Sequence, residues 1–131
     1  MLPSGREPCR TGTSAKRLNR LPVPYRMGNE VIVSKGGNIG RVTVNRPKQL
    51  NAMNSATRNA IVKAFEQFGS DSDVRVIILA GAGEKSFIAG ADLAEFAASG
   101  KLDSAKMRNE WHMTEVAATC PTPIIAMIDG F

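Results

Sequence analysis

Cysteine, histidine and aromatic residues are scarce in this 131-residue sequence, which has two cysteines, one histidine and 5% aromatic residues. Cys9 and Cys120 form neither a disulfide framework nor a C-x-x-C metal spacing, so we expect both to be reduced, as suits a reducing compartment. His112 has no serine or cysteine nucleophile pattern around it, and we expect a packed or surface side chain. These scarcities argue against a disulfide-stabilised, metal-binding or triad-type protein.

Long apolar runs are also missing. The longest, residues 76–80, has the length of a strand and falls well short of the roughly 20 residues of a membrane span. No signal-peptide h-region is visible. There is no P-loop, and the glycines of residues 36–40 lead into a strand, whereas phosphate binding needs them to open a helix. We therefore expect no membrane span, and neither of these nucleotide-binding motifs.

The net charge of +5 lies at one end of the sequence. Residues 1–28 hold six basic residues and one acidic residue, whereas residues 29–131 hold eleven of each. A nucleic-acid-binding domain normally carries its basic stripe on the folded part, so we expect no DNA partner and no RNA binding by residues 29–131. With 43% apolar residues in the chain, the body can bury a core.

Residues 1–28 are predicted to be a basic, proline-containing extension of a domain that covers residues 29–131. The Arg-rich, acid-poor composition resembles a mitochondrial transit peptide, but four prolines argue against the amphipathic helix that such a peptide needs. We prefer a disordered tail or a start-site artefact, with translation beginning at Met27, and expect residues 1–26 to be disordered or absent in the mature protein. The expected location is cytoplasmic, or the mitochondrial matrix if residues 1–26 are a transit peptide.

The first half of the body predicts a hairpin followed by a helix. Residues 31–33 and 39–45 flank a turn cluster, which is typical of a β-hairpin. Asn54 or Ser55 can cap a helix that ends near Gly69 as a C-cap. Its apolar face follows the 3.6-residue period and consists of Ala60, Ile61, Ala64, Phe65 and Phe68.

The second half adds two strands and a helix. Residues 74–79 form a nearly continuous β-branched run, which is typical of a strand covered on both faces in a mostly parallel sheet. A helix over residues 104–119 carries a predicted core stripe of Met107, Trp111, Thr114 and Ala118. Residues 124–128 predict another buried strand. The element order indicates an α/β fold with right-handed crossovers, and we expect it to be incomplete because the sequence stops directly after a core strand.

Residues 86–93 are the most informative candidate site. Small residues between a strand and a helix leave the backbone bare, and the first N–H groups of a helix lack intrahelical partners. This geometry suits a phosphate or a developing oxyanion. Spacing alone favours the ordinary alternative, a Gly-rich turn with Asp92 near a helix N-terminus.

Three motifs occur in the order in which the enoyl-CoA hydratase/isomerase (crotonase) family has them. They are IGRVTVNRPKQLNAMN at residues 39–54, VIILAG with FIAGADL at residues 76–81 and 87–93, and PIIAMIDGF at residues 123–131. Each alone is weak, but together they are specific and cover nearly all of residues 29–131. The sequence therefore resembles this family, and the resemblance implies an α/β, crotonase-like (ClpP/crotonase) spiral of β-β-α units, incomplete at the C-terminus.

The resemblance also implies a site for a coenzyme A thioester, which is a substrate and not a bound cofactor. The Ala91 backbone N–H would be one of two oxyanion-hole donors to the thioester carbonyl. One wall of the adenine and pantetheine path would consist of Ala89, Asp92 and Leu93. The other wall would consist of Lys48, Leu50 and Ala52, with Lys48 near the nucleotide phosphates.

The expected function is acyl-CoA ester processing by an enoyl-CoA hydratase or isomerase, a homo-oligomer (trimer or hexamer) when full length. In the family, the second oxyanion glycine and the reaction-specific glutamates lie beyond the position of Phe131, so we expect residues 1–131 alone to be inactive. Four glutamates match no catalytic position of the family: Glu84, Glu95, Glu110 and Glu115. Two alternatives stay open: an RNA-binding hydratase homologue that uses the basic extension, and a non-catalytic truncated subunit.

Overall fold

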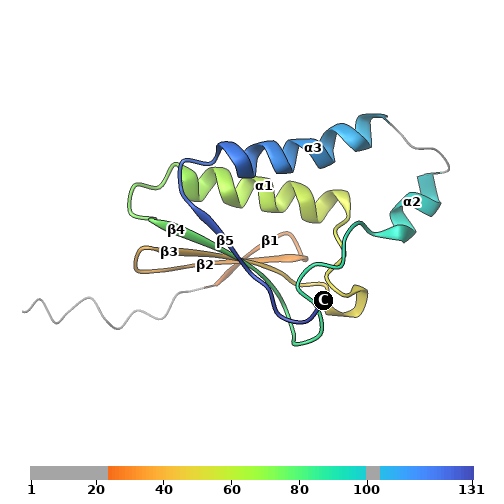
Figure 1. Cartoon of the computed structure of the whole chain (residues 1–131), viewed down its shortest axis with the longest axis horizontal. Coiled ribbons are helices and arrows are strands. Elements are labelled where there is room, and N and C mark those ends of the chain that lie inside the picture. Colours follow the sequence, from red (N-terminus) through yellow and green to blue (C-terminus); the bar gives the residue numbers. More distant parts are fainter. Residues whose placement is uncertain (1–23, 100–103) are drawn as a thin grey trace, which may run out of the picture.

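The computed structural model describes residues 24–99 and 104–131 of the chain. Its centre is a five-stranded sheet in the order β1-β2-β3-β4-β5 (Figure 1). Strands β1, β2 and β3 pair antiparallel, whereas β3, β4 and β5 pair parallel. The strands are Tyr25–Met27 (β1), Val31–Gly36 (β2), Ile39–Val44 (β3), Val76–Gly81 (β4) and Ile124–Met127 (β5).

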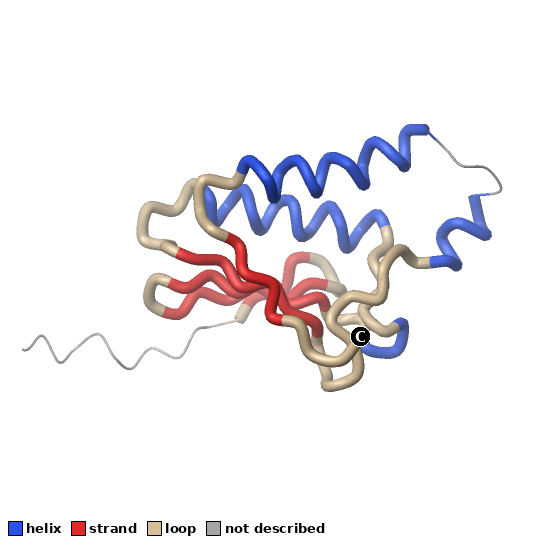
Figure 2. Tube along the Cα trace, in the orientation of Figure 1, coloured by secondary structure: helices blue, strands red, loops and turns tan. Residues whose placement is uncertain are grey.

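Helices connect the parallel strands and cover one face of the sheet. The described helices are a short 3-10 turn, Pro47–Gln49 (η1), and three α-helices, Ser55–Gly69 (α1), Leu93–Ser99 (α2) and Ser104–Thr119 (α3). Figure 2 shows α1 and α3 running side by side above the sheet, and the two helices pack against each other. This arrangement confirms the expected α/β architecture.

The predicted hairpin and the predicted first helix are confirmed. Strands β2 and β3 pair over their whole length around a turn at Gly37, which has a left-handed φ of 58° that glycine adopts without strain. The Asn54 side chain caps α1 by accepting the Thr57 N–H at 2.8 Å. The C-cap is Ser70 and not Gly69, because the Ser70 hydroxyl itself binds the last carbonyl groups of the helix.

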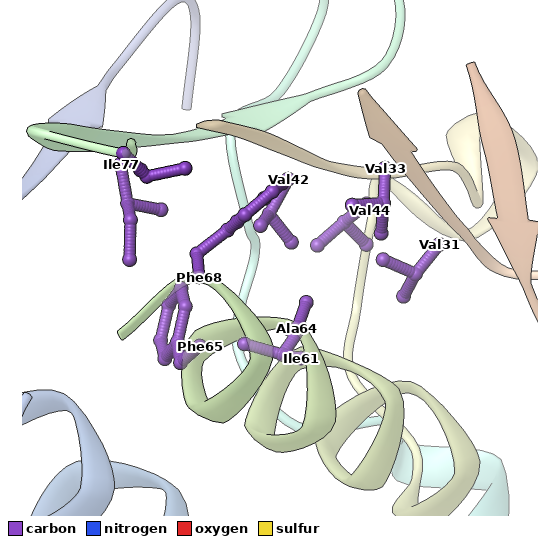
Figure 3. Packing of buried hydrophobic residues seen from close by; sticks show 10 residues of the cluster. Val31, Val33, Val42, Val44, Ile61, Ala64, Phe65, Phe68 and Ile77 are labelled. Atoms are coloured by element: carbon purple, nitrogen blue, oxygen red, sulfur yellow. The ribbon is translucent and has the colours of Figure 1, made fainter. Parts of the chain in front are cut away.

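The core lies between the sheet and α1 (Figure 3). Side chains at most 2% exposed meet there, and burying each large one contributes about 1.5–3 kcal/mol. Gly40 allows this close packing, since a Cβ at that position would lie 2.7 Å from the ring of Phe68. From the sheet come Val31, Val33, Val42, Val44 and Ile77, and from α1 come Ile61, Ala64, Phe65 and Phe68.

Two strand predictions need correction. Strand β5 is not buried: Ile125 is 55% and Met127 is 43% exposed, because these alternate residues stand on the face of the sheet opposite α1 and α3, which no described helix covers. Strand β4 is covered only in part on its outer face: Ile77 is buried on the side of α1, and on the opposite face Ala80 is buried whereas Val76 and Ile78 are half-buried. In the described part of the chain both long helices lie on the same face, so the outer face stays accessible.

The predicted N-terminal boundary of the domain and the predicted buried face of the second long helix also differ from the structure. Strand β1 pairs with β2, so the sheet begins before residue 29, inside the segment predicted to be an extension; residues 1–23 lie outside the described residues. Helix α3 has the predicted bounds, but its predicted stripe is wrong at Thr114 and Ala118, which are exposed. The side chains of Met107 and Trp111 lie outside the described part. The face of α3 that packs on the core carries Met113, Val116 and Ala117.

Candidate functional site

The candidate site forms where two connecting segments run side by side. One segment follows β3 through η1 to α1, and the other follows β4 to α2. An isolated parallel bridge joins Met53 to Ala91. Around it, the Met53 N–H donates to the Gly90 carbonyl at 2.8 Å and the Asp92 N–H donates to the Met53 carbonyl at 3.0 Å. The Ala89 N–H donates to the Leu50 carbonyl at 3.2 Å.

This bridge leaves the Ala91 N–H available. In a parallel ladder, alternate residues bond to opposite sides, and the residues on either side of Ala91 make both bonds to Met53. The Ala91 N–H therefore turns away from Met53, and it forms no hydrogen bond with any described residue. A backbone donor held by a bridge and left without an acceptor suits an oxygen atom of a ligand.

A cavity of about 230 Å³ lies against Ala91. It is bounded by the bridge, by the start of α1 and by α3. The two methionines of its lining are unbranched and adaptable, which suits a small apolar group. The lining consists of Met53, Arg58, Gly90, Ala91, Met113 and Thr114, and none of these is a carboxylate.

A second, larger cavity of about 580 Å³ lies further along the same two segments. Lys48 on η1 and Lys85 on the turn after β4 both line it and are both exposed, so two basic residues and one acidic residue, Glu84, border this cavity. Two predicted site residues, Lys48 and Leu50, lie here, whereas Ala91 lines the smaller cavity. The remaining lining residues are Pro47, Asn51, Ala82, Gly83 and Ser86.

Asn51 fastens the two segments together beside this cavity. It is 1% exposed, and its side-chain amide donates to the carbonyls of Ala82 at 2.9 Å and Ser86 at 2.7 Å. Its side-chain oxygen accepts the Arg46 N–H at 3.0 Å. Asn51 and the preceding Leu50 both have left-handed backbones, with φ of 57° and 51°. Such conformations cost roughly 1–2 kcal/mol for residues with a Cβ, so the buried amide bonds hold a strained corner at the site.

Asp92 is occupied by contacts within the protein. Its carboxylate pairs with Arg46 at 2.7 Å and accepts the Ala94 N–H at 3.0 Å, and its carbonyl accepts the Glu95 N–H. Hydrogen bonding from Arg46 lowers the pKa of Asp92 below its ordinary value. The expectation that the first N–H groups of the following helix face a ligand is therefore wrong at Ala94 and Glu95, because Asp92 binds them. The available donor is the N–H of Ala91, which directly precedes Asp92 and lies in the bridge.

The other predicted site residues lie near the bridge without a contact that defines a role. Ala89 is exposed and Ala52 is half-buried, and both lie on the paired segments. Leu93, the first residue of α2, is 80% exposed. Their predicted contacts with coenzyme A remain predictions.

Several site residues were not found from the sequence, and Arg58 is the clearest. It is 3% exposed, lines the smaller cavity and donates to the Met53 carbonyl at 2.9 Å. Its guanidinium also contacts Ser55 and Glu95. The burial of Arg58 could have been predicted from the sequence, because Arg58 lies three residues before Ile61, on the same face of α1. Arg46, Asn51, Met113 and Thr114 were missed too.

Other candidates stay outside the site. His112 is exposed, as one of its two expected placements requires, and Cys120 is a half-buried free thiol. Among the residues that the structure describes, no cluster of metal-binding side chains is found. Within the same residues, no helix combines the length and apolar character needed to cross a membrane.

Known proteins similar to this chain point to one family. The family model for "Enoyl-CoA hydratase/isomerase" matches residues 39–131. The chain belongs to the enoyl-CoA hydratase/isomerase family. The predicted crotonase-like fold is confirmed by a solved enoyl-CoA hydratase/carnithine racemase from Magnetospirillum magneticum, with a TM-score of 0.71 and 32% identity over 82% of this chain and 40% of that one.

Two curated relatives differ in their named reactions. The short-chain-enoyl-CoA hydratase of Clostridium acetobutylicum is 38% identical over 107 residues, which is 79% of this chain and 40% of that protein. The mitochondrial 3-hydroxyisobutyryl-CoA hydrolase of Danio rerio is 33% identical over 119 residues, which is 88% of this chain and 31% of that protein. The chain thus spans 31–40% of the length of these relatives, and both relatives are named for acyl-CoA thioesters.

Proposed function

We propose that the protein containing this chain processes acyl-CoA thioesters, with the Ala91 N–H as a backbone donor to the thioester oxygen. The observation that carries the proposal is the orientation of this N–H, which the Met53–Ala91 bridge turns away from Met53 and leaves without an acceptor among the residues that the structure describes. Chemistry at the α or β carbon of a thioester passes through an enolate, whose negative charge gathers on that oxygen. A preorganised donor of this kind contributes about 10²–10³ in rate.

The two cavities suggest how such a thioester would lie. The smaller cavity, beside Ala91, fits a short acyl group, and the larger cavity, with Lys48 and Lys85, fits the phosphorylated end of coenzyme A. Lysine is a flexible point charge suited to phosphate groups. The paired segments between the cavities would then follow the pantetheine arm.

We further propose hydration of an enoyl-CoA as the reaction. The support is the short-chain-enoyl-CoA hydratase relative, which is 38% identical. Hydrolysis is the second candidate, supported by the 3-hydroxyisobutyryl-CoA hydrolase relative, which matches 88% of this chain. Both need acid–base groups, and the smaller cavity contains no carboxylate among its described lining residues. The chain's described contribution is therefore to bind the thioester and stabilise the oxyanion.

The test uses the protein that contains this chain with short-chain enoyl-CoA and 3-hydroxyacyl-CoA thioesters. Loss of the ultraviolet absorbance of the conjugated enoyl thioester reports hydration, and release of free thiol reports hydrolysis. Ala91→Pro removes the N–H and should lower turnover by about 10²-fold or more. Ala91→Ser keeps the N–H and should lose far less.

A matched control is Ala56→Pro. Ala56 is exposed and lies in the first turn of α1, where proline is tolerated, so this variant should keep its activity. Circular dichroism must show each variant folded. Undiminished turnover in folded Ala91→Pro would refute the proposed donor, and absence of both reactions in the unsubstituted protein would refute the proposed function.

A further inference from the structure

We propose that Arg46 and Asp92 are positioning residues for the Ala91 N–H, an inference that rests on the proposed function. Their ion pair joins Arg46 Nη2 to Asp92 Oδ2 at 2.7 Å, and the side chains are only 11% and 13% exposed. Asp92 directly follows Ala91 in the chain. Fixing the Asp92 carboxylate therefore fixes one end of the short segment that carries the donor.

Arg46 holds the opposite side of the bridge as well. Its guanidinium donates to the Ala52 carbonyl, which directly precedes Met53, the bridge partner of Ala91. One side chain thus binds residue 52 on one segment and residue 92 on the other. The guanidinium therefore adds a side-chain link on both sides of the bridge, beside the backbone bonds of Met53, and helps to fix the direction of the Ala91 N–H between them.

A third contact anchors the guanidinium itself. Arg46 Nε lies 3.1 Å from Glu30 Oε1, at the turn between β1 and β2. Glu30 also accepts hydrogen bonds from Asn54 at 3.0 Å and Thr57 at 2.5 Å, at the start of α1. The sheet, the first helix and the bridge therefore share one polar connection. A planar guanidinium with five N–H groups in a fixed fork can serve three partners at once, which a lysine ammonium cannot do with the same geometry.

This role differs from direct contact with coenzyme A. Substituting a residue that lines the coenzyme path would change KM. Arg46 lines neither of the two site cavities, so its substitution should leave KM nearly unchanged. A positioning pair instead predicts that either substitution lowers kcat by a similar factor. Displacing a reacting group by about 1 Å costs on the order of 10²-fold in rate.

The test compares the variants Arg46→Met, Asp92→Asn, the double variant and Arg46→Lys in the protein that contains this chain. Each single variant should lower kcat about tenfold to a hundredfold with a change in KM below about threefold. The double variant should lose no more than the single variants, because both remove the same interaction. Arg46→Lys keeps the charge and should recover part of the lost kcat.

The matched control is the ion pair of Lys35 and Asp71, whose charged atoms lie 2.6 Å apart between the end of β2 and the turn before β4. Lys35→Met and Asp71→Asn remove an ion pair that lies outside the two paired segments, and kcat should stay within about twofold of the unsubstituted protein. An equal loss of kcat in these controls would overturn the inference. So would Arg46 and Asp92 variants that keep their kcat, or that change only KM.

A readout without substrate separates this inference from the proposed function. Hydrogen exchange at the Asp92 N–H, which donates to the Met53 carbonyl, should become faster in Arg46→Met and stay unchanged in Lys35→Met. If the unsubstituted protein turns over no acyl-CoA thioester, the proposed function fails and the catalytic part of the inference fails with it. If exchange at Asp92 is the same with and without Arg46, the positioning claim itself is overturned, whatever the activity.

Discussion

Gly81, the last residue of β4, supports the candidate site through the absence of a side chain. A Cβ at this position would lie 2.5 Å from the Ser86 carbonyl oxygen and 2.8 Å from the Asn51 side-chain nitrogen, and it would also collide with the Phe87 carbonyl. Ordinary contact begins near 3.4 Å. Gly81→Ala must therefore push the segment after β4 outwards by about 1 Å, because two of the three obstacles are backbone.

The expected cost of Gly81→Ala combines two effects. Overpacking costs about 1–3 kcal/mol, and stretching the bonds of the buried Asn51 amide costs about 1–3 kcal/mol more. The free energy of unfolding should therefore fall by about 2–6 kcal/mol, out of a typical total of about 5–15 kcal/mol. Turnover of acyl-CoA should fall on the order of 10²-fold, as expected for a displacement of about 1 Å.

Urea denaturation and acyl-CoA turnover of the protein that contains this chain would check Gly81→Ala. Gly37→Ala is the control, because its φ of 58° strains an alanine while nothing lies within 4 Å of the added Cβ. It should cost roughly 1–2 kcal/mol without loss of turnover. A change in unfolding free energy below about 1 kcal/mol for Gly81→Ala would refute the reasoning.

Two further predictions concern pH and self-association. Arg46 lowers the pKa of Asp92 below 3.8, so the pair stabilises the fold above about pH 4, and this contribution is lost as the pH falls through the lower, folded value. Melting temperatures from pH 7 to pH 3 should fall more steeply below pH 4 for the unsubstituted protein than for Asp92→Asn; parallel curves would contradict this. Residues 1–131 expressed alone should self-associate, because the apolar side chains of Ile128 and Phe131 are 67% and 82% exposed. They should also be inactive, because no carboxylate is among the described lining residues of the cavity beside Ala91. A monodisperse, cooperatively melting and active species in size-exclusion and thermal experiments would show the opposite.

Local patterns in the sequence predicted the framework of the fold. The alternation of Val42 and Val44, the cap at Asn54 and the apolar face of α1 depend on neighbours within a few residues, and the structure confirms each of them. The burial of β5 could not be read in the same way. A run of β-branched residues shows that a strand can be covered, whereas its exposure depends on which elements lie over it.

The candidate site shows the same division. The position of Ala91 came from the resemblance to a family, whereas the reason its N–H is free is the bridge to Met53, a residue 38 positions earlier in the chain. The pairing of Arg46 with Asp92 likewise joins residues 46 positions apart. Single-sequence patterns contain no information on such pairs. The left-handed backbone of Leu50 could not be predicted either, because residues with a Cβ, such as leucine, rarely adopt a positive φ.

The central claim, that the Ala91 N–H binds the thioester oxygen, is tested most directly by the vibrational frequency of the bound carbonyl group. A short saturated acyl-CoA with a ¹³C-labelled thioester carbonyl binds without being hydrated, and isotope-edited infrared difference spectra report how strongly that carbonyl is polarised. In the unsubstituted protein that contains this chain, the carbonyl stretch should shift to lower frequency on binding. In folded Ala91→Pro most of that shift should be lost, whereas an equal shift in both proteins, each saturated with ligand, would contradict the account.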